Sequence, residues 1–94
     1  MRAAQWTLDA QADLAHIDAF YAETAPDYAD RVGDAAIVAA TFLAERPYAG
    51  PPVGKGHERK WNVRTTPYIL FYRVIDNGVE ILRVRHGHEN WQDE

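Results

Sequence analysis

The chain has 94 residues, with 47% hydrophobic and 26% charged side chains, no cysteine and a net charge of −4 at neutral pH. This length predicts one domain, residues 1–94, and the composition is typical of a soluble globular protein. Without cysteine there is no disulfide framework and no thiolate metal site. The start, MRAAQWTLDAQADL, lacks the apolar core of a signal peptide, and no run approaches the ~18 apolar residues of a membrane span. We therefore expect a cytoplasmic protein that does not associate with membranes.

The charges divide the chain into an acidic first part and a basic second part. Residues 1–54 carry three basic and eight acidic side chains, a net charge of −5, whereas residues 55–88 carry seven basic and three acidic ones, a net charge of +4. The last six residues add −3. Overall acidity argues against non-specific binding to nucleic acid, because that affinity grows with each phosphate neutralised. We also expect no sequence-specific DNA binding by the chain alone, although a local basic face remains available for other partners.

The N-terminal part predicts a short strand followed by an amphipathic helix. Ala4–Thr7 is the candidate strand. Asp9 is the candidate N-cap, because its carboxylate can accept hydrogen bonds from the free amides of a first helical turn. After it, apolar side chains recur at the spacing of one helical stripe: Ala10, Leu14, Ile17 and Tyr21.

A second helix follows a short break at ETAPDYAD. Thr24 is a candidate cap, and Pro26 suits a first helical turn, where its missing amide costs nothing. The clearest periodicity in the chain then places five residues on one narrow face: Ala29, Val32, Ala36, Ala39 and Leu43. Pro47 and Gly50 end the helix. The short link between the two helices predicts an antiparallel helical hairpin.

Three more strands are predicted after the turn-rich stretch PYAGPPVGKG. His57–Arg64 alternates weakly, and Tyr68–Ile75 is apolar on both faces, like a central strand. Val79–His86 pairs with it through Asn77-Gly78, a strong indication of a hairpin turn. The predicted order is β-α-α-β-β-β. The fold class is therefore α+β, with a helical hairpin packed on a small antiparallel sheet.

Three segments resemble the RelE/ParE superfamily of toxins from bacterial type II toxin–antitoxin systems: ADLAHIDAFYAETAPDYADRV, FLAERPYAG and PYILFYRVIDNGVEILRVRHGHENW. The similarity runs from Leu8 to Trp91 and is closest to the ParE, or plasmid-stabilisation, branch. It implies a growth-inhibiting toxin that is neutralised by a cognate antitoxin, ParD-like or similar, of which a segment folds on binding. It leaves two activities open. ParE-like members, where characterised, mostly poison DNA gyrase and are not enzymes in the usual sense, whereas RelE-like members cut messenger RNA on the ribosome.

The chain matches the RNA-cutting members poorly. Cleavage by the RNA's own 2′-hydroxyl needs a base, an acid and cations that stabilise the charged phosphorane. YoeB-like relatives supply a glutamate, an arginine opening the central strand and a histidine near the C-terminus. Here Tyr68 or Ile69 stands in the place of that arginine, and Trp91 cannot titrate as the terminal tyrosine of RelE does. Only His86 aligns with the terminal histidine, and Glu58 is a loose candidate for the carboxylate.

The leading interpretation is thus a ParE-like toxin that binds DNA gyrase and has no catalytic residue, cofactor or metal. Its predicted target-binding residues are Arg59, Lys60, Arg83, Arg85, His86 and His88. The alternative is a ribosome-dependent mRNA endoribonuclease in which His86 acts as acid or base, supported by Arg83, Arg85 and Lys60. A third interpretation, kept open by the acidic charge balance, is a non-toxic relative that only binds an antitoxin.

The histidines also have a plain structural interpretation. His86 and His88 stand two positions apart and share one strand face, and exposed polar residues are common at strand ends. With His57 they are the candidates for metal ligands, but the sequence defines neither a third ligand nor the geometry that zinc requires.

The arginines and Trp61 allow both roles as well. Arg83 and Arg85 are predicted to share a strand face with Ile81, where they either contact the target or form ion pairs with the acidic helices. Arg73, inside the central strand, is predicted to be a structural residue partnered by a carboxylate. Trp61 is predicted to belong to the core.

Overall fold

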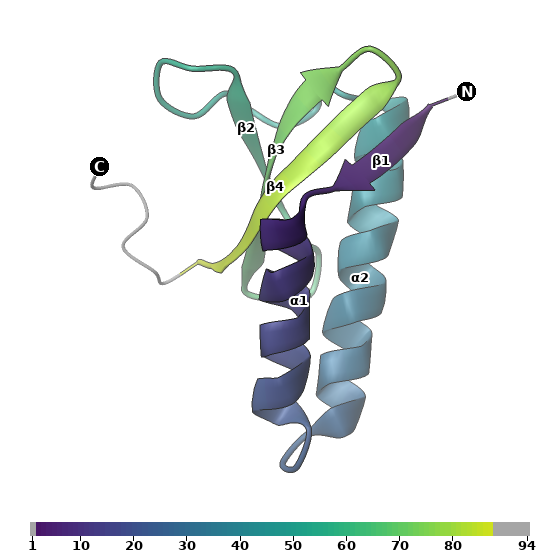
Figure 1. The fold of residues 1–94 in the computed structure, drawn as a ribbon, viewed down its shortest axis with the longest axis vertical. Coiled ribbons are helices and arrows are strands. Elements are labelled where there is room, and N and C mark those ends of the chain that lie inside the picture. Colours follow the sequence, from purple (N-terminus) through teal and green to yellow (C-terminus); the bar gives the residue numbers. More distant parts are fainter. Residues whose placement is uncertain (1, 88–94) are drawn as a thin grey trace.

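The computed structural model describes residues 2–87, and Figure 1 shows this part of the chain as two helices standing beside a twisted sheet. The elements follow in the predicted order: β1 (Ala3–Trp6), α1 (Leu8–Tyr21), α2 (Pro26–Glu45), β2 (Glu58–Asn62), β3 (Tyr68–Ile75) and β4 (Gly78–His86). The α+β fold with a helical hairpin packed on a sheet is therefore confirmed. β1 begins and ends one residue earlier than predicted, and β2 is shorter at both ends.

β1 makes the sheet mixed rather than wholly antiparallel. The strand order is β1-β4-β3-β2, and the pairs β4–β3 and β3–β2 are antiparallel as predicted. β1 instead lies parallel to β4, with Ala3 opposite Gly78 and Trp6 opposite Ile81. Parallel neighbours need a long crossover connection, which the intervening helices and strands supply. The first strand of the chain is thereby held against the last one, and α1 starts directly beyond it (Figure 1).

The two helices form an antiparallel hairpin over one face of the sheet. All five residues predicted to share one face of α2 are buried, as are Ala10 and Ile17 of α1, while Leu14 and Tyr21 are partly buried. Apart from Ala29, these side chains pack in one cluster with residues of β3 and β4: Tyr68, Leu70, Tyr72, Val79, Ile81 and Val84. The predicted core stripes are therefore confirmed for both helices.

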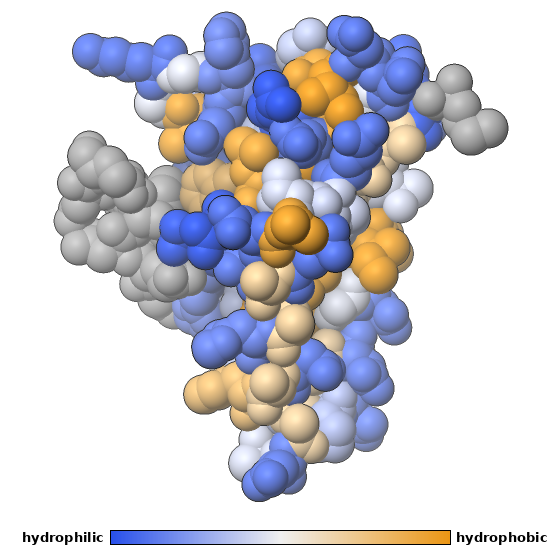
Figure 2. All heavy atoms as spheres, viewed as in Figure 1, coloured by the Kyte–Doolittle hydropathy of each residue, from blue (hydrophilic) through white to orange (hydrophobic). Residues whose placement is uncertain are grey.

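α1 also carries an exposed apolar strip on its outer side. Figure 2 shows a band of weakly apolar spheres that runs down over α1. Its exposed residues recur at helical spacing: Leu8, Ala12, Ala15, Ala19 and Ala22. Because apolar residues lie on both sides of α1, its inner stripe is less distinct in the sequence than that of α2.

The turn between β1 and α1 is held by Thr7. Its hydroxyl accepts a hydrogen bond from the amide of Ala10 (3.0 Å) and donates one to the carbonyl of Leu82 (3.1 Å). The prediction that Asp9 is the N-cap was wrong, because α1 already begins at Leu8 and Thr7 occupies the extended capping position. Asp9 lies instead in the first turn, where a negative charge interacts favourably with the helix dipole.

α2 begins without a side-chain cap. Pro26 occupies the first turn as predicted, but Ala25 stands at the N-cap and contributes no side-chain hydrogen bond. The predicted capping by Thr24 was therefore wrong, because Thr24 lies one position before the residue whose side chain can reach the first-turn amides. The helix ends at Glu45, shortly before Pro47, as predicted.

A β-bulge in β4 decides which of its side chains face the helices. The register between β3 and β4 skips Leu82, so the regular alternation of faces is interrupted there. Ile81 and Val84 both face the helices and are buried, whereas Arg83 and Arg85 lie on the opposite side of the sheet. The prediction that the two arginines share a face with Ile81 was wrong, because one inserted residue exchanges the faces of all residues after it.

Candidate functional site

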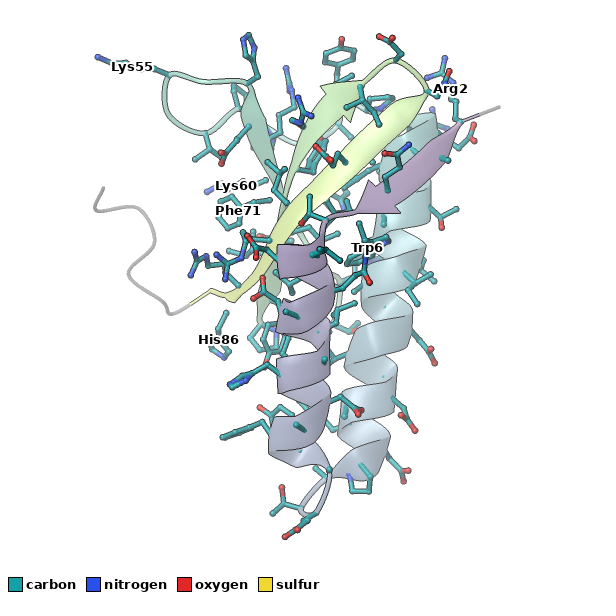
Figure 3. The ribbon with its side chains drawn as sticks, in the orientation of Figure 1. Arg2, Trp6, Lys55, Lys60, Phe71 and His86 are labelled. Carbon is teal, nitrogen blue, oxygen red and sulfur yellow. The ribbon has the colours of Figure 1, made fainter. Side chains whose placement is uncertain are left out.

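Three of the predicted target-binding residues lie together on the side of the sheet opposite the helices. Ile69 and Phe71 of β3 point to this side, because the residues that alternate with them pack under the helices. Lys60 of β2 and Arg83 of β4 flank Phe71 across the sheet, and Arg85 stands opposite Ile69. Figure 3 shows Lys60 and Phe71 next to each other on the side away from the helices. We call this set the basic face: Lys60, Ile69, Phe71, Arg83 and Arg85.

The basic face combines an apolar centre with a cationic rim. Ile69 and Phe71 are only 8% and 6% exposed, so they form a packed centre. Lys60, Arg83 and Arg85 are partly exposed around it. The exposed part of the basic face is therefore its cationic rim, and three cations favour carboxylates on a partner.

Arg83 also forms the ion pair with an acidic helix that the sequence left as one of two alternatives. Its guanidinium donates two hydrogen bonds to the carboxylate of Asp13 in α1, from Nε to Oδ2 (2.8 Å) and from Nη2 to Oδ1 (3.0 Å). The amide of Val84 donates a third, also to Oδ2 (2.8 Å). Burial raises the pKa of Asp13, but the hydrogen bonds from Arg83 and Val84 and the charges of Arg83 and Arg85 outweigh it and hold that pKa below its usual value.

His86 lies at the end of β4 and faces the helix side of the sheet. It stands opposite Tyr68 and its ring meets the Tyr68 ring edge-on, 5.2 Å between centroids. It lines a cavity of about 290 Å³ between α1 and the end of β4, which we call the notch; its lining comprises Asp13, His16, Ile17, Phe20, Tyr68, Arg83, Val84, Arg85 and His86. Figure 3 shows His86 beside α1, apart from Lys60 and Phe71. His88 lies outside the described residues.

Arg59 is not part of the basic face. Its guanidinium donates a hydrogen bond to the carbonyl of Gly50 (2.6 Å) and lies over the ring of Tyr48 at 5.0 Å. The hydroxyl of Tyr72 fixes the same connector, because it donates to the carbonyl of Pro47 (2.8 Å) and accepts from the amide of Gly50 (2.9 Å). Burial raises the pKa of Tyr72, although the Gly50 amide and the charge of Arg59 oppose this. Arg59 thus shapes the connector before β2.

The acid and base candidates for RNA cleavage do not converge. Glu58 stands opposite Arg73 on β3, whereas His86 stands opposite Tyr68, five residues away along the same strand. At ~3.4 Å per residue this separates the two positions by roughly 17 Å. They also differ in face, because Glu58 pairs across the sheet with Arg73 and not with the residues under the helices.

The described residues contain neither a cluster of metal-ligand side chains nor a membrane-spanning helix. Within residues 2–87, no three histidine, aspartate or glutamate side chains gather as metal ligands would. Neither described helix combines the length and the apolar character that a membrane crossing requires.

Comparison with known proteins places this geometry in a family. The profile described as "ParE toxin of type II toxin-antitoxin system, parDE" matches residues 4–91. The chain belongs to the ParE toxin family. Among its relatives, "Toxin ParE2" of Mycobacterium tuberculosis is 38% identical over 79 residues, covering 83% of this chain and 74% of the relative. "Putative toxin Y4kP" of Sinorhizobium fredii is 39% identical over 87 residues, covering 93% and 90%.

Solved structures agree with the ParE assignment in fold. The chain resembles one described as "Chromosomal ParDE TA system from P. aeruginosa" with a TM-score of 0.76, at 24% identity, over 92% of this chain and 96% of that one. It also resembles one described as the toxin-antitoxin complex RelBE2 from Mycobacterium tuberculosis, with a TM-score of 0.58 at 25% identity and 90% coverage of both chains. The suspected RelE/ParE resemblance is therefore confirmed.

Two structural predictions for this ParE toxin are confirmed as well. Arg73 pairs with a carboxylate, that of Glu80, at 2.6 Å. Trp61 is partly buried against the core and stacks on Phe42 of α2, 5.3 Å between ring centroids. The sequence did not single out Asp13 or His16 as site residues. Both are polar and lie off the apolar stripe of α1, which indicated that they are not core residues. Their contact with β4 could not be predicted, because the contacting residues are some 70 positions away in the chain.

Proposed function

We propose that this ParE toxin inhibits growth by binding DNA gyrase through the basic face, and that a cognate antitoxin of the ParD type neutralises it in the cytoplasm. The toxin acts by binding and not by making or breaking covalent bonds. The observation that carries the proposal is the basic face itself. It gathers three partly exposed cations on one side of the sheet, around a buried apolar centre, and such a cluster favours an acidic surface on a protein partner.

The separation of the nuclease candidates supports binding over catalysis. An acid and a base must reach the same phosphate to cut RNA, and Glu58 and His86 occupy opposite ends of β3. The second candidate, a ribosome-dependent endoribonuclease, retains one favourable observation. His86 lines the notch together with Arg83 and Arg85, so a histidine and two cations do lie around one cavity.

A groove between α2 and β2 supports the antitoxin part of the proposal. It is mostly apolar, has a volume of about 390 Å³ and is lined in part by Val38, Phe42 and Trp61. The outer edge of β2 is already bonded by the connector, since the amide of Lys60 donates to the carbonyl of Pro51 (3.1 Å). An added strand has little free edge to pair with there, so we propose that a helix of the antitoxin occupies the groove.

Induced expression in a bacterial host tests the proposed target. Protein synthesis and DNA-damage signalling are followed in parallel within minutes of induction. We expect DNA damage to rise before translation falls. An immediate stop in translation with cleaved messages would instead establish the endoribonuclease, and unimpaired growth with folded protein would establish a non-toxic antitoxin-binding relative.

Variants make the same experiment specific to the basic face. Lys60→Gln combined with Arg85→Gln is expected to abolish growth inhibition, whereas His86→Gln is expected to leave most of it. Lys55→Gln is the matched control, because Lys55 is an exposed cation of the connector outside both the basic face and the notch. Full loss of toxicity in a folded His86→Gln variant would contradict the proposal.

A further inference from the structure

We propose that α2 pairs with α2 of a second copy of this chain, in an antiparallel arrangement centred on Val38. The inference goes beyond the proposed function, because it concerns the toxin before an antitoxin or a target has bound it. α1 lies along one side of α2 (Figure 1), and a different face of α2 remains exposed. The second copy would cover that exposed face.

The exposed face of α2 carries a second apolar seam. Ala35, Val38 and Phe42 recur at spacings of three and four residues, as the buried stripe of the same helix does. Val38 is 68% exposed, Phe42 is 38% exposed and Ala35 is partly exposed. Alternating spacings of three and four residues are the pattern by which two helices pack along a shared seam at about 20°. This outer seam therefore favours another helix as its occupant.

Opposite charges end the outer seam at equal distances from its centre. Arg31 lies seven residues before Val38, and Glu45 lies seven residues after it. Seven residues are about two helical turns, so both side chains stand on the same face as Val38, each about 10 Å from it along the helix axis. Both residues are exposed, and no ion pair within residues 2–87 involves either of them. The Arg31 guanidinium lies 5.9 Å from the centroid of the Tyr28 ring, a contact that does not neutralise its charge.

Two copies of such a seam complement each other when they pack antiparallel. A two-fold axis at Val38 places Arg31 of one copy opposite Glu45 of the other, and the same pair forms again at the other end of the seam. The axis also places Asp30 of one copy opposite Arg46 of the other. A parallel pair would instead bring Arg31 against Arg31 and Glu45 against Glu45, so like charges would meet at both ends. The charges therefore select the antiparallel arrangement.

A second copy accounts for this symmetry better than an unrelated partner does. An isologous interface requires that complementary charges lie at equal distances from its axis, whereas an unrelated helix imposes no such spacing on α2. Asp34 on the same face falls opposite Phe42 of the second copy and meets no like charge there. The seam from Arg31 to Glu45 is about 20 Å long, so the interface is small and the dimer forms at high protein concentration. Val38 and Phe42 also line the groove assigned to the antitoxin, so the dimer and the antitoxin complex exclude each other.

Analytical ultracentrifugation of the full chain over a wide range of concentrations tests the dimer. We expect a reversible equilibrium between monomer and dimer. ¹H–¹⁵N NMR spectra of the same samples should show that amide signals of residues 31–45 shift on dilution. A chain that stays monomeric up to its solubility limit, or dilution shifts confined to other residues, would overturn the inference.

Charge reversal separates this interface from any other mode of self-association. Arg31→Glu and Glu45→Arg are each expected to weaken the dimer about tenfold or more, because each variant brings like charges together at both ends of the seam. An equimolar mixture of the two variants should recover the affinity of the unchanged chain, since opposite charges meet again in the heterodimer. Damage to the fold of either variant cannot produce this recovery.

Lys55→Glu is the matched control, because it reverses an exposed cation of the connector and changes the net charge by the same amount as Arg31→Glu. It should leave the dimer unchanged. Equal weakening by Lys55→Glu, or a mixture of the two α2 variants that fails to recover, would overturn the inference. These measurements use the purified toxin alone, so their failure is distinguishable from failure of the gyrase target or of antitoxin binding.

Discussion

At the residue scale, Asp13 joins the middle of α1 to the part of β4 that β1 does not reach. One carboxylate satisfies both a guanidinium and the backbone amide of Val84 at the strand edge. Because the amide needs a partner and no strand within residues 2–87 pairs with this part of the edge, the carboxylate takes the place of a sheet hydrogen bond. The same contact orients Arg83 between the basic face and the notch.

We expect Asp13→Asn to lower the free energy of unfolding by about 1.5–3 kcal/mol at neutral pH, because hydrogen bonds to a charged group are lost or weakened. The pKa of Asp13 is lowered in the fold, so its contribution is fully present above the unfolded pKa of about 3.9 and is lost as pH falls through the lower folded value. Urea unfolding of both proteins from pH 7 to pH 3 checks this. The difference between them should shrink in acid.

Asp18→Asn is the matched control for this comparison. Asp18 is an exposed residue of the same helix and lies away from the notch lining. A pH-independent loss of stability in Asp13→Asn, or an equal loss in Asp18→Asn, would contradict the role given to the Asp13 carboxylate.

The Asp13 contact also marks a limit of sequence-based prediction at this scale. The pattern of charges predicted that arginines of the last strand either pair with the acidic helices or face a target. It did not select Asp13 among eight acidic residues of residues 1–54. Which carboxylate pairs with Arg83 depends on where β1 ends and on the bulge at Leu82. Neither feature produces a periodic pattern in the sequence from which it could be predicted.

At the scale of elements, the connector between α2 and β2 is held by close contact rather than by regular structure. Gly50 stands where an added Cβ would lie 2.2 Å from the carbonyl oxygen of Lys60 and 2.8 Å from the hydroxyl of Tyr72. Its amide donates a hydrogen bond to the hydroxyl of Tyr72, and its carbonyl accepts one from the guanidinium of Arg59. The connector therefore requires a residue without a side chain at this point.

We expect Gly50→Ala to cost more than about 2 kcal/mol of unfolding free energy, because the methyl group meets backbone that cannot move without breaking β2. Gly56→Ala is the control in the same connector, since its Cβ would meet nothing within 4 Å. Thermal unfolding of the two variants checks this. A Gly50→Ala protein as stable as Gly56→Ala would show that the connector can shift freely.

The groove between α2 and β2 allows a prediction about the antitoxin. Val38 is 68% exposed on α2, so Val38→Asp should leave folding intact, while a buried aspartate at the interface would weaken the antitoxin complex. We expect the variant to remain toxic and to lose rescue by the co-expressed antitoxin. Asp34→Asn, an exposed change on the same helix outside the groove lining, should still be rescued. Full rescue of Val38→Asp would place the antitoxin elsewhere.

Elements whose apolar residues recur with a clear period were predictable from the sequence, whereas the residues at which these elements begin and end were less predictable. The 3- and 4-residue spacing of α2 and the Asn77-Gly78 turn reflect local geometry, and both are found as predicted. Caps depend on where the chain enters the helix, and here Thr7 is placed by β4 through Leu82. Such choices are made by contacts that are distant in the sequence.

At the scale of the whole molecule, the fold places the acidic helices and the basic strand residues in different parts of the structure. The acidic helices cover one side of the sheet, and the basic face lies on the other. The prediction of an acidic helical part and a basic strand part is borne out in the order of the elements. Sequence patterns could not show that Arg59 bonds the connector and lies outside the basic face, because that contact depends on how the connector folds back over β2.

The sheet topology predicts that the chain without β4 does not fold. A chain of residues 1–77 lacks the partner of β1, one partner of β3 and the groups that bind Asp13. We expect it to lack the chemical-shift dispersion of the full chain in ¹H–¹⁵N NMR spectra, since too little core remains. Native-like dispersion in the shorter chain would show that the helices and the first strands fold by themselves.

Because β1 and α1 bind β4, the fold also has an order in time. β4 is the last described element to be synthesised, and the first two elements cannot complete their contacts before it has left the ribosome. Long-range pairing of this kind forms late. The basic face needs β2, β3 and β4 together, so a nascent chain is expected to be harmless until translation is nearly complete. We therefore expect a chain that ends before β4 to be unfolded and to lack a complete basic face.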